Sequence, residues 1–283
     1  MSQVKQEILR ELRDHSHIEL SYIIPYYFNQ DNGAALTDYL KQYALYPPEL
    51  LDRIQFVLVD DGSPVKISIP TDLNLNILAL RIDIDIPWNQ GGARNLGVVY
   101  ARSDKVLITD FDHFFPVQTL LKLVNMPHPG KNVYRMPRRD SEGAKMYRHC
   151  NTFMMSRGHY IGLYGVDEEF CGHYGFEDSM MWRWQKAHGI RFYTLSDKYH
   201  TIHAAIDRTK SYHSLKRDLS YNEALARKKK EDLEKYGPNS CHSRNFLCFP
   251  WTVVNDLYRK SNTYQRKKRP FWYKIWWLRW LWQ

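Results

Sequence analysis

The sequence predicts an α/β fold in which a mostly parallel sheet carries helices on both faces. Short apolar runs of strand length alternate with stretches of helical periodicity between residues 18 and 108. This order of strand, helix, strand, helix and strand is typical of such sheets. Ligands bind these sheets at the carboxyl ends of the strands, so we expect the functional residues where the strands end.

The expected elements follow one another with short connections. Strands are predicted over residues 18–25, 54–59, 75–81, 106–108, 133–137, 152–156 and 191–195. Helices are predicted over 34–46, 117–125, 179–188 and 215–236, with one more after the glycine pair Gly91-Gly92. Pro25 is expected to end the first strand, because proline lacks the backbone donor that a central strand needs.

Composition places the chain among ordinary globular proteins. It has 283 residues, 43% hydrophobic and 25% charged, with a net charge of +9. Eight Lys or Arg and no acid lie between Arg259 and Gln283. The net charge of the remaining residues is therefore close to zero, and we predict no nucleic-acid partner. The four cysteines form no CxxC pair and are expected as reduced thiols. No apolar run is long enough to span a membrane, and no apolar signal core is seen at the N-terminus.

Two carboxylates follow the buried strand that Val106–Ile108 predicts. Asp110 and Asp112 lie two apart, and on extended chain they would point to the same side. Such carboxylates repel each other unless a cation or a proton lies between them. Mg²⁺ or Mn²⁺ carrying a phosphate-bearing substrate would meet this need, because both ions prefer oxygen ligands. The alternative is a polar turn after a strand, where aspartate is common.

Five motifs in chain order resemble a known family. Ile23-Ile24-Pro25, Val59–Ser63, Gly92–Gly97 and Asp110–Asp112 resemble the nucleotide-sugar-binding half of GT-A glycosyltransferases, particularly family 2. Tyr174–Asp178 resembles the acceptor-side Gly-x-Gly-Glu-Asp element of galactosyl- and N-acetylgalactosaminyl-transferases, with Phe176 where a second glycine is usual. The resemblance covers about residues 18–205, and it implies a Rossmann-like GT-A sheet.

The resemblance implies metal-dependent, inverting transfer of a sugar from a nucleoside-diphosphate donor. UDP is the expected nucleotide, and the acceptor element favours a galactose-type sugar. Mn²⁺ or Mg²⁺ would be held by Asp112 and would neutralise the diphosphate leaving group. His200 or His203 would complete the metal shell through a ring nitrogen; surface or core packing is the alternative for each.

The resemblance also implies a donor-binding set. It comprises Pro25, Asp61 on the uracil edge, Arg94 beside the base or a phosphate, and Asp110 near the ribose or a metal-bound water. For Asp61, capping of the turn at Gly62 is the alternative.

The general base is expected at the second acid of the Glu177-Asp178 pair. Inversion requires a base that deprotonates the acceptor hydroxyl, and the family places it at Asp178. Glu177 would bind acceptor or donor hydroxyls. The alternative is a structural role, in which both carboxylates only stabilise the N-terminal end of the helix by interacting with its dipole.

The organisation expected from these motifs is an arm over 1–17, a GT-A catalytic domain over 18–210 and a helical extension over 211–283. The extension ends in the basic run Arg266–Arg269 and in Phe271–Trp282, which holds five of the nine tryptophans. Tryptophan and basic residues favour the membrane interface, so the tail predicts a cytoplasmic enzyme peripheral on the inner face of the cell membrane. Its acceptor would be a surface glycan, such as capsule or lipopolysaccharide, or a lipid-linked precursor. Packing of the tail on the protein is the alternative.

Two other functions are compatible with these residues. The first is a catalytically inactive sugar-binding or scaffold protein of the same fold. The second is a nucleotidyltransferase, which also uses paired acids and a metal but releases pyrophosphate from a nucleoside triphosphate.

Overall fold

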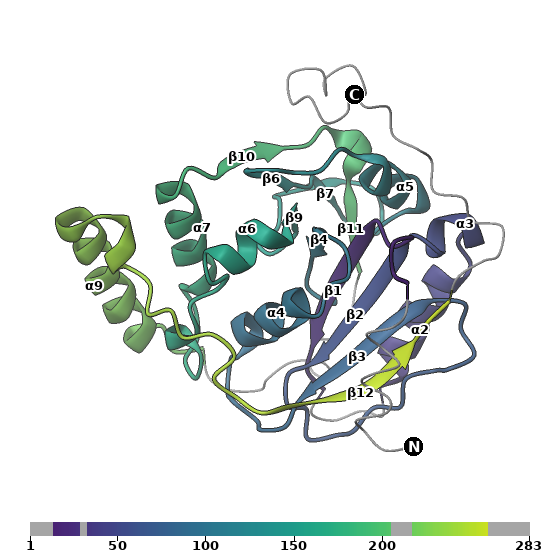
Figure 1. Cartoon of the computed structure of the whole chain (residues 1–283), viewed down its shortest axis with the longest axis horizontal. Helices are drawn as coiled ribbons and strands as arrows, with labels where there is room; N and C mark the ends of the chain where they lie inside the picture. Colours follow the sequence, from purple (N-terminus) through teal and green to yellow (C-terminus); the bar gives the residue numbers. More distant parts are fainter. Residues whose placement is uncertain (1–13, 29–32, 205–216, 260–283) are drawn as a thin grey trace.

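One eight-stranded sheet organises the part of the chain that the computed structural model describes, residues 14–28, 33–204 and 217–259 (Figure 1). In spatial order its strands are β10 (Arg191–Thr194), β6 (Asn132–Arg135), β9 (Phe153–Ser156), β4 (Lys105–Ile108), β1 (Leu20–Tyr26), β2 (Ile54–Asp60), β3 (Asn76–Ile82) and β12 (Trp251–Leu257). Strands β4, β1, β2 and β3 are mutually parallel, whereas β9 and β12 run antiparallel to their neighbours. The predicted mainly parallel sheet is confirmed.

Helices cover both faces of this sheet. They are α2 (Ala34–Ala44), α3 (Pro48–Leu51), α4 (Gln90–Val99), α5 (Val117–Asn125), α6 (Arg157–Gly162), α7 (Glu177–Ala187) and α9 (Ser220–Tyr236), with 3-10 turns η1 (Glu168–Phe170), η2 (Asp197–Tyr199) and η3 (Pro238–Ser240). Helices α2, α3 and α5 pack on one face, and α4, α6 and α7 pack on the other. A second sheet, in spatial order, contains β5 (His113–Phe114), β11 (Thr201–His203), β7 (Arg138–Arg139) and β8 (Lys145–Met146).

Strand β1 supplies side chains to both cores. Leu20, Tyr22 and Ile24 enter the core beneath α2, and Ile23 enters the core beneath α4, as the alternation of a strand requires. The buried Tyr22 and Tyr39 hydroxyls lie 2.7 Å apart, and Tyr39 Oη donates to the carbonyl of His113 at 2.7 Å. Helix α2 therefore helps to fix the segment that follows β4.

Strand β1 runs through Pro25 to Tyr26, contrary to the prediction that the proline ends it. Pro25 is paired with Val59 of β2 in the parallel register. On the other side of β1, pairing with β4 stops at Ile23, whose carbonyl accepts from Thr109 N at 3.2 Å. The backbone of Pro25 points to the same side of β1 as that of Ile23. Because β4 no longer pairs with β1 at this position, no hydrogen bond between the strands requires the N–H that proline lacks.

Helix α4 lies close to the sheet because Gly97 faces β1 and β2. A Cβ at Gly97 would come within 2.4 Å of Ile23 Cγ2 and 3.1 Å of Val59 Cγ2. A methyl group there would overpack the interface and displace the helix. The glycine thus sets the depth of α4, and with it the position of Arg94 one turn earlier.

The region after residue 210 contains α9, as expected, but it also returns to the main sheet. Strand β12 pairs antiparallel with β3, with a register shift between Val253 and Asn255. The prediction of a purely helical extension is therefore wrong. The edge of β3 offers backbone hydrogen-bond partners to β12, and pairing between segments so far apart in the sequence leaves no signal in the local residue pattern. Glu168 of η1 also accepts from Leu247 N at 2.8 Å and Cys248 N at 3.0 Å. The tail over 260–283 lies outside the described residues.

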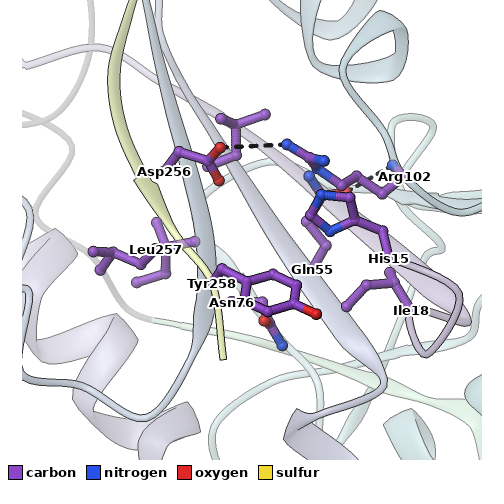
Figure 2. Close-up of a pocket in the computed structure, with 10 residues that line it drawn as sticks. His15, Ile18, Gln55, Asn76, Arg102, Asp256, Leu257 and Tyr258 are labelled. Carbon is purple, nitrogen blue, oxygen red and sulfur yellow. Dashed lines mark hydrogen bonds and ion pairs between the residues drawn. The ribbon is translucent and has the colours of Figure 1, made fainter. Parts of the chain in front are cut away.

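The amino ends of the central strands carry a separate, very small cavity of about 10 Å³ (Figure 2). Figure 2 shows Arg102 facing Asp256 across it, with their side chains 3.4 Å apart. Tyr258 Oη donates to the carbonyl of Asp14 at 2.7 Å at this edge. The space suits at most a water molecule. No helix in the described ranges is long and apolar enough to cross a membrane.

Candidate functional site

The chain turns sharply where β4 ends, and this turn separates the two aspartates. The amide of His113 donates to the carbonyl of Asp110 at 3.1 Å, so residues 110–113 form a turn and not the extended chain that was expected. Asp110 faces α4, whereas Asp112 faces His113 and His203. Each carboxylate therefore has its own cationic or imidazole partners, and a shared cation between them is not required.

Asp112 is the centre of a cluster of possible metal ligands. Its Oδ1 lies 2.5 Å from His113 Nδ1, and its Oδ2 lies 3.7 Å from His203 Nδ1. One ligand atom from each of the three residues lies within 4.8 Å of the others. Burial alone would raise the pKa of Asp112, but the hydrogen bond and charge of His113, with His149 and His203, lower it to about 2. Asp112 is thus an ionised carboxylate beside imidazole nitrogens.

This donor set fits a divalent transition metal. The His113 ring is fully buried, and its Nε2 has no hydrogen-bond partner in the described part of the chain. A carboxylate with two imidazoles suits Mn²⁺ better than Mg²⁺, which prefers oxygen ligands alone.

The two histidines expected near the metal lie in different places. His203, at the end of β11, belongs to the cluster, because β11 pairs antiparallel with β5 and sets His203 opposite His113. His200 is outside the cluster: its Nδ1 lies 3.0 Å from the carbonyl of Asp197, and its own carbonyl accepts from Thr119 Oγ1 at 3.0 Å. His200 therefore joins η2 to α5.

A buried arginine joins the two halves of the site. Arg94 of α4 is 1% exposed, and its Nη2 donates to Asp110 Oδ1 at 2.8 Å while its Nη1 donates to Asp178 Oδ1 at 2.7 Å. Burial would lower the pKa of Arg94, but the charges of Asp178 and Asp110 outweigh burial and raise it. The guanidinium therefore stays charged and links the end of β4 to the start of α7.

Neutral amides complete the surroundings of Asp110. Gln90 Nε2 donates to its Oδ1 at 2.7 Å, and Asn151 Nδ2 donates to its Oδ2 at 3.1 Å. His149 Nδ1 lies 3.6 Å from the same Oδ2. Asp110 thus accepts three hydrogen bonds from protein donors, two at Oδ1 and one at Oδ2.

Asp61 and Pro25 lie at the ends of neighbouring strands. Asp61 follows β2, is 4% exposed and accepts from Asn89 Nδ2 at 2.9 Å. Its amide donates to the carbonyl of Tyr26 at 2.9 Å, which places it beside Pro25 at the end of β1. Burial raises the pKa of Asp61 well above its usual range. The adjacent Asp60 forms an ion pair with Arg81.

The acceptor-like element begins helix α7 through a strained residue. Phe176 has φ 70° and ψ −20°, a left-handed conformation that glycine adopts without strain and a bulky residue does not. This explains why a glycine would be the easier choice at that position. The loop before it is held by Asn222 of α9, whose Nδ2 lies 2.9 Å from the carbonyl of His173 and 2.8 Å from that of Gly175.

The two acids at the start of α7 differ in environment. Asp178 is ion-paired with Arg94, and its Oδ2 lies 3.7 Å from Cys150 Sγ. The Oε2 atom of Glu177 is buried without a hydrogen-bond partner among the described residues. Burial, reinforced by the charge of Asp178, raises the pKa of Glu177 to about 8. At neutral pH the raised pKa therefore favours the protonated form of Glu177.

Sequence reasoning did not assign several residues that the structure brings into this site. His113 is visible in the motif, but only the turn directs its ring toward Asp112. His149 and Asn151 follow the polar loop after β8 and show no local signal. Asn89 and Gln90 precede the glycine pair, where amides are common for reasons unrelated to ligands.

The raised pKa of Glu177 predicts a pH dependence of stability. An unfolded glutamate titrates near pH 4.3, so between about pH 4.5 and 8 the folded chain holds a proton that the unfolded chain has lost. The free energy of unfolding should therefore fall as pH rises through this range. Glu177→Gln should flatten that slope in urea unfolding measured at several pH values. The exposed Glu49→Gln serves as a control and should keep the parent slope; equal slopes in parent and Glu177→Gln would show that Glu177 ionises normally.

The fold and its site can now be compared with known proteins. Comparisons with protein-family models and with curated protein sequences find no match. Among solved structures, residues 1–349 of TarS from S. aureus in complex with UDP-GlcNAc align with a TM-score of 0.54 and 16% identity, over 76% of this chain and 66% of that one. The same TarS segment without a named ligand aligns with a TM-score of 0.52, and its UDP complex with 0.50, each over 76% of this chain and 65% of that one. The aligned region thus spans slightly less than two thirds of those TarS chains. TarS is a GT-A glycosyltransferase, and at this identity the likeness concerns the fold: the chain has a GT-A fold.

Proposed function

We propose that this chain is a metal-dependent, inverting glycosyltransferase that moves a sugar from a nucleoside-diphosphate donor, a UDP-sugar, to an acceptor hydroxyl. The observation that carries the proposal is the carboxylate–imidazole cluster of Asp112, His113 and His203 at the carboxyl end of β4 in a GT-A fold. Ligands bind α/β sheets at this edge. That the similar TarS chain has structures with UDP-GlcNAc and with UDP supports the choice of nucleotide.

Asp112, His113 and His203 would hold Mn²⁺ or, less suitably, Mg²⁺. When bound, the metal would neutralise the negative charge of the diphosphate leaving group. Because Asp112 is ionised down to about pH 2, no proton competes for its oxygens at neutral pH. The buried His113 Nε2 supplies a polar atom that lacks any other partner in the described ranges.

The donor nucleotide would lie over the ends of β1 and β2. Pro25 and Asp61 adjoin there, and Asn89 holds one Asp61 oxygen, so the carboxyl group presents a defined edge to the uracil ring. Asp110 and Arg94 would act mainly through their ion pair, which with Asp178 joins the end of β4 to the start of α7.

Asp178 is the proposed general base. Arg94 fixes its Oδ1, so the other oxygen, Oδ2, is the one that would accept the proton of the acceptor hydroxyl. Glu177, held neutral by its raised pKa, would donate a hydrogen bond to a sugar hydroxyl and would not compete as a base. The two adjacent acids thus take different roles because their environments differ.

The tail and the acceptor form a second part of the proposal. The basic and tryptophan-rich residues 266–283 would associate with an anionic membrane surface, and the acceptor would be a surface glycan or lipid-linked precursor. The catalytic unit would include residues 18–210 together with β12.

Removal of the central metal ligand tests the metal site. Asp112→Ala should weaken UDP binding in Mn²⁺ by about tenfold or more, as loss of one charged ligand implies, and should leave the weaker binding in EDTA unchanged. Calorimetric titration of UDP under both conditions measures this. Asp256→Ala, which removes another ion-paired aspartate at the far edge of the sheet, is the matched control. Equal losses with and without metal would contradict the metal role.

Replacing the base tests the chemistry. Asp178→Asn keeps the shape of the side chain and should lower turnover at least about a hundredfold, while UDP-sugar affinity stays within a few-fold of the parent. Turnover is measured as UDP release, with water or added sugars as acceptor and Mn²⁺ present. Asp256→Asn also alters an Arg–Asp pair and should leave turnover unchanged. Parent-like turnover in Asp178→Asn would exclude Asp178 as the base, and no UDP release from any UDP-sugar by the parent would favour an inactive binding protein.

Deleting residues 266–283 tests membrane association. The deletion should release the protein from anionic liposomes, because each basic residue near such a surface contributes about 1 kcal/mol. Cosedimentation measures this, and thermal unfolding with and without UDP checks that the remaining chain is folded. A deleted chain that unfolds or changes its oligomeric state would identify the tail as a packing element.

A further inference from the structure

The two carboxylates that bind the buried guanidinium also share neighbours on one short segment. His149, Cys150 and Asn151 are consecutive and lie between β8 and β9. Asn151 Nδ2 donates to Asp110 Oδ2 at 3.1 Å, and His149 Nδ1 lies 3.6 Å from the same oxygen. Cys150 Sγ lies 3.7 Å from Asp178 Oδ2 and donates its hydrogen to that oxygen. The segment therefore contacts both the end of β4 and the start of α7.

The carboxylate oxygens differ in the strength of these contacts. Arg94 donates to Oδ1 of Asp110 and to Oδ1 of Asp178. The Oδ2 atom of Asp110 accepts from the amide of Asn151. In the part of the chain that the structure describes, the Oδ2 atom of Asp178 accepts only from the thiol of Cys150. A thiol is a weak donor, so a hydroxyl group displaces it from this oxygen more easily than it would displace an amide or a guanidinium.

The thiol of Cys150 keeps its proton at neutral pH. The residue is exposed overall, but burial of its sulfur, with the charge of Asp178, raises the pKa of Cys150 to about 12. The group is therefore a hydrogen-bond donor and not a thiolate.

Two buried polar atoms beside this contact have no partner. Asn151 is 5% exposed, and its Oδ1 makes no hydrogen bond within the described ranges. The Oε2 atom of Glu177 is in the same state. These residues directly adjoin Cys150 and Asp178 in the chain. A buried polar atom without a partner costs free energy, which a hydrogen bond with a bound hydroxyl group would offset. The surroundings of the contact therefore suit a ligand with several hydroxyls.

We propose that Cys150 is a positioning residue for the base: its thiol holds Oδ2 of Asp178 while the acceptor is absent, and the acceptor hydroxyl then takes its place. Arg94 fixes only the other oxygen, and the last torsion of an aspartate is broad, so the second contact limits rotation of the carboxylate. The incoming hydroxyl reaches Oδ2 beside the sulfur, which makes Cys150 part of the wall of the acceptor site. This inference rests on the proposed function, because it assigns a role beside the proposed base.

Substitution of Cys150 in the full chain tests the contact. Turnover is measured as UDP release from the UDP-sugar that the parent hydrolyses fastest, with water as acceptor and Mn²⁺ present. Cys150→Ala should lower kcat about three- to tenfold, the effect of one hydrogen bond, while KM for the UDP-sugar stays within about twofold of the parent. Cys150→Ser keeps a donor and should recover most of that loss. Cys248→Ala removes another exposed thiol and should behave as the parent does.

Modification of the thiol tests where the acceptor binds. Methyl methanethiosulfonate transfers a methylthio group to the sulfur: an S–S bond forms, the thiol proton goes to solvent and methanesulfinate leaves. The added group should fill the space at Oδ2 and lower UDP release at least about tenfold, because it keeps the acceptor from the base. UDP affinity in Mn²⁺, measured by calorimetry, should not change, and dithiothreitol should restore turnover. Cys150→Ala should resist the reagent, whereas Cys248→Ala should remain sensitive to it.

The outcomes separate this inference from the proposed function. Parent-like kcat in Cys150→Ala, together with unaffected turnover of the modified parent, overturns the inference. An equal loss of UDP affinity in either experiment also overturns it, because Cys150 would then lie on the donor side. In both cases an active parent leaves the proposed function in place. If the parent releases no UDP from any UDP-sugar, the proposed function fails and this inference fails with it.

Discussion

The arrangement of the site depends on one ion-paired group, the guanidinium of Arg94. It is almost completely excluded from solvent and neutralised by Asp110 on one side and Asp178 on the other. Removing one partner of such a buried pair typically costs about 3–5 kcal/mol, because a charge is then left uncompensated. The end of β4 and the start of α7 are thus joined by an ion-paired group, in addition to the apolar core that Ile108 shares with Met181. The depth of α4, set by Gly97 against Ile23 and Val59, decides where that charge lies.

Two buried carboxyl groups of this site, those of Asp112 and Glu177, differ in protonation state because their neighbours differ. Asp112 is buried yet strongly acidic, because three imidazoles surround it. Glu177 is buried without such partners, and it holds its proton up to about pH 8. An ionised ligand and a neutral hydrogen-bond donor can therefore coexist at neutral pH in one site. Burial alone does not decide the state; the neighbours within hydrogen-bond reach do.

The sequence allowed most of the fold and part of the site to be predicted. The parallel core follows from apolar runs and helical periodicity. Asp61 and Asp112 were expected in the site from the strand-end motifs and from the resemblance to GT-A glycosyltransferases. The structure places Asp61 directly after β2 and Asp112 in the turn after β4, while their roles stay predictions. The partners of Arg94 were not predictable, since they come from loops that meet only in three dimensions. The same holds for His113 and His149, whose roles depend on how a turn and a loop direct their rings. His200 and His203 were indistinguishable by pattern, and β-strand register separates them.

Strand β12 has a consequence for how the chain is made. Strands β1 to β4 emerge from the ribosome early, but β3 is covered on its outer side only when Trp251–Leu257 arrives. Until then β3 presents a long, apolar strand with unpaired backbone groups, the kind of edge that pairs with other chains. A chain that ended after residue 210 would keep this edge of the sheet open, and such a chain would be prone to self-association. In the folded chain, β12 occupies this edge of β3 and so prevents another strand from pairing there.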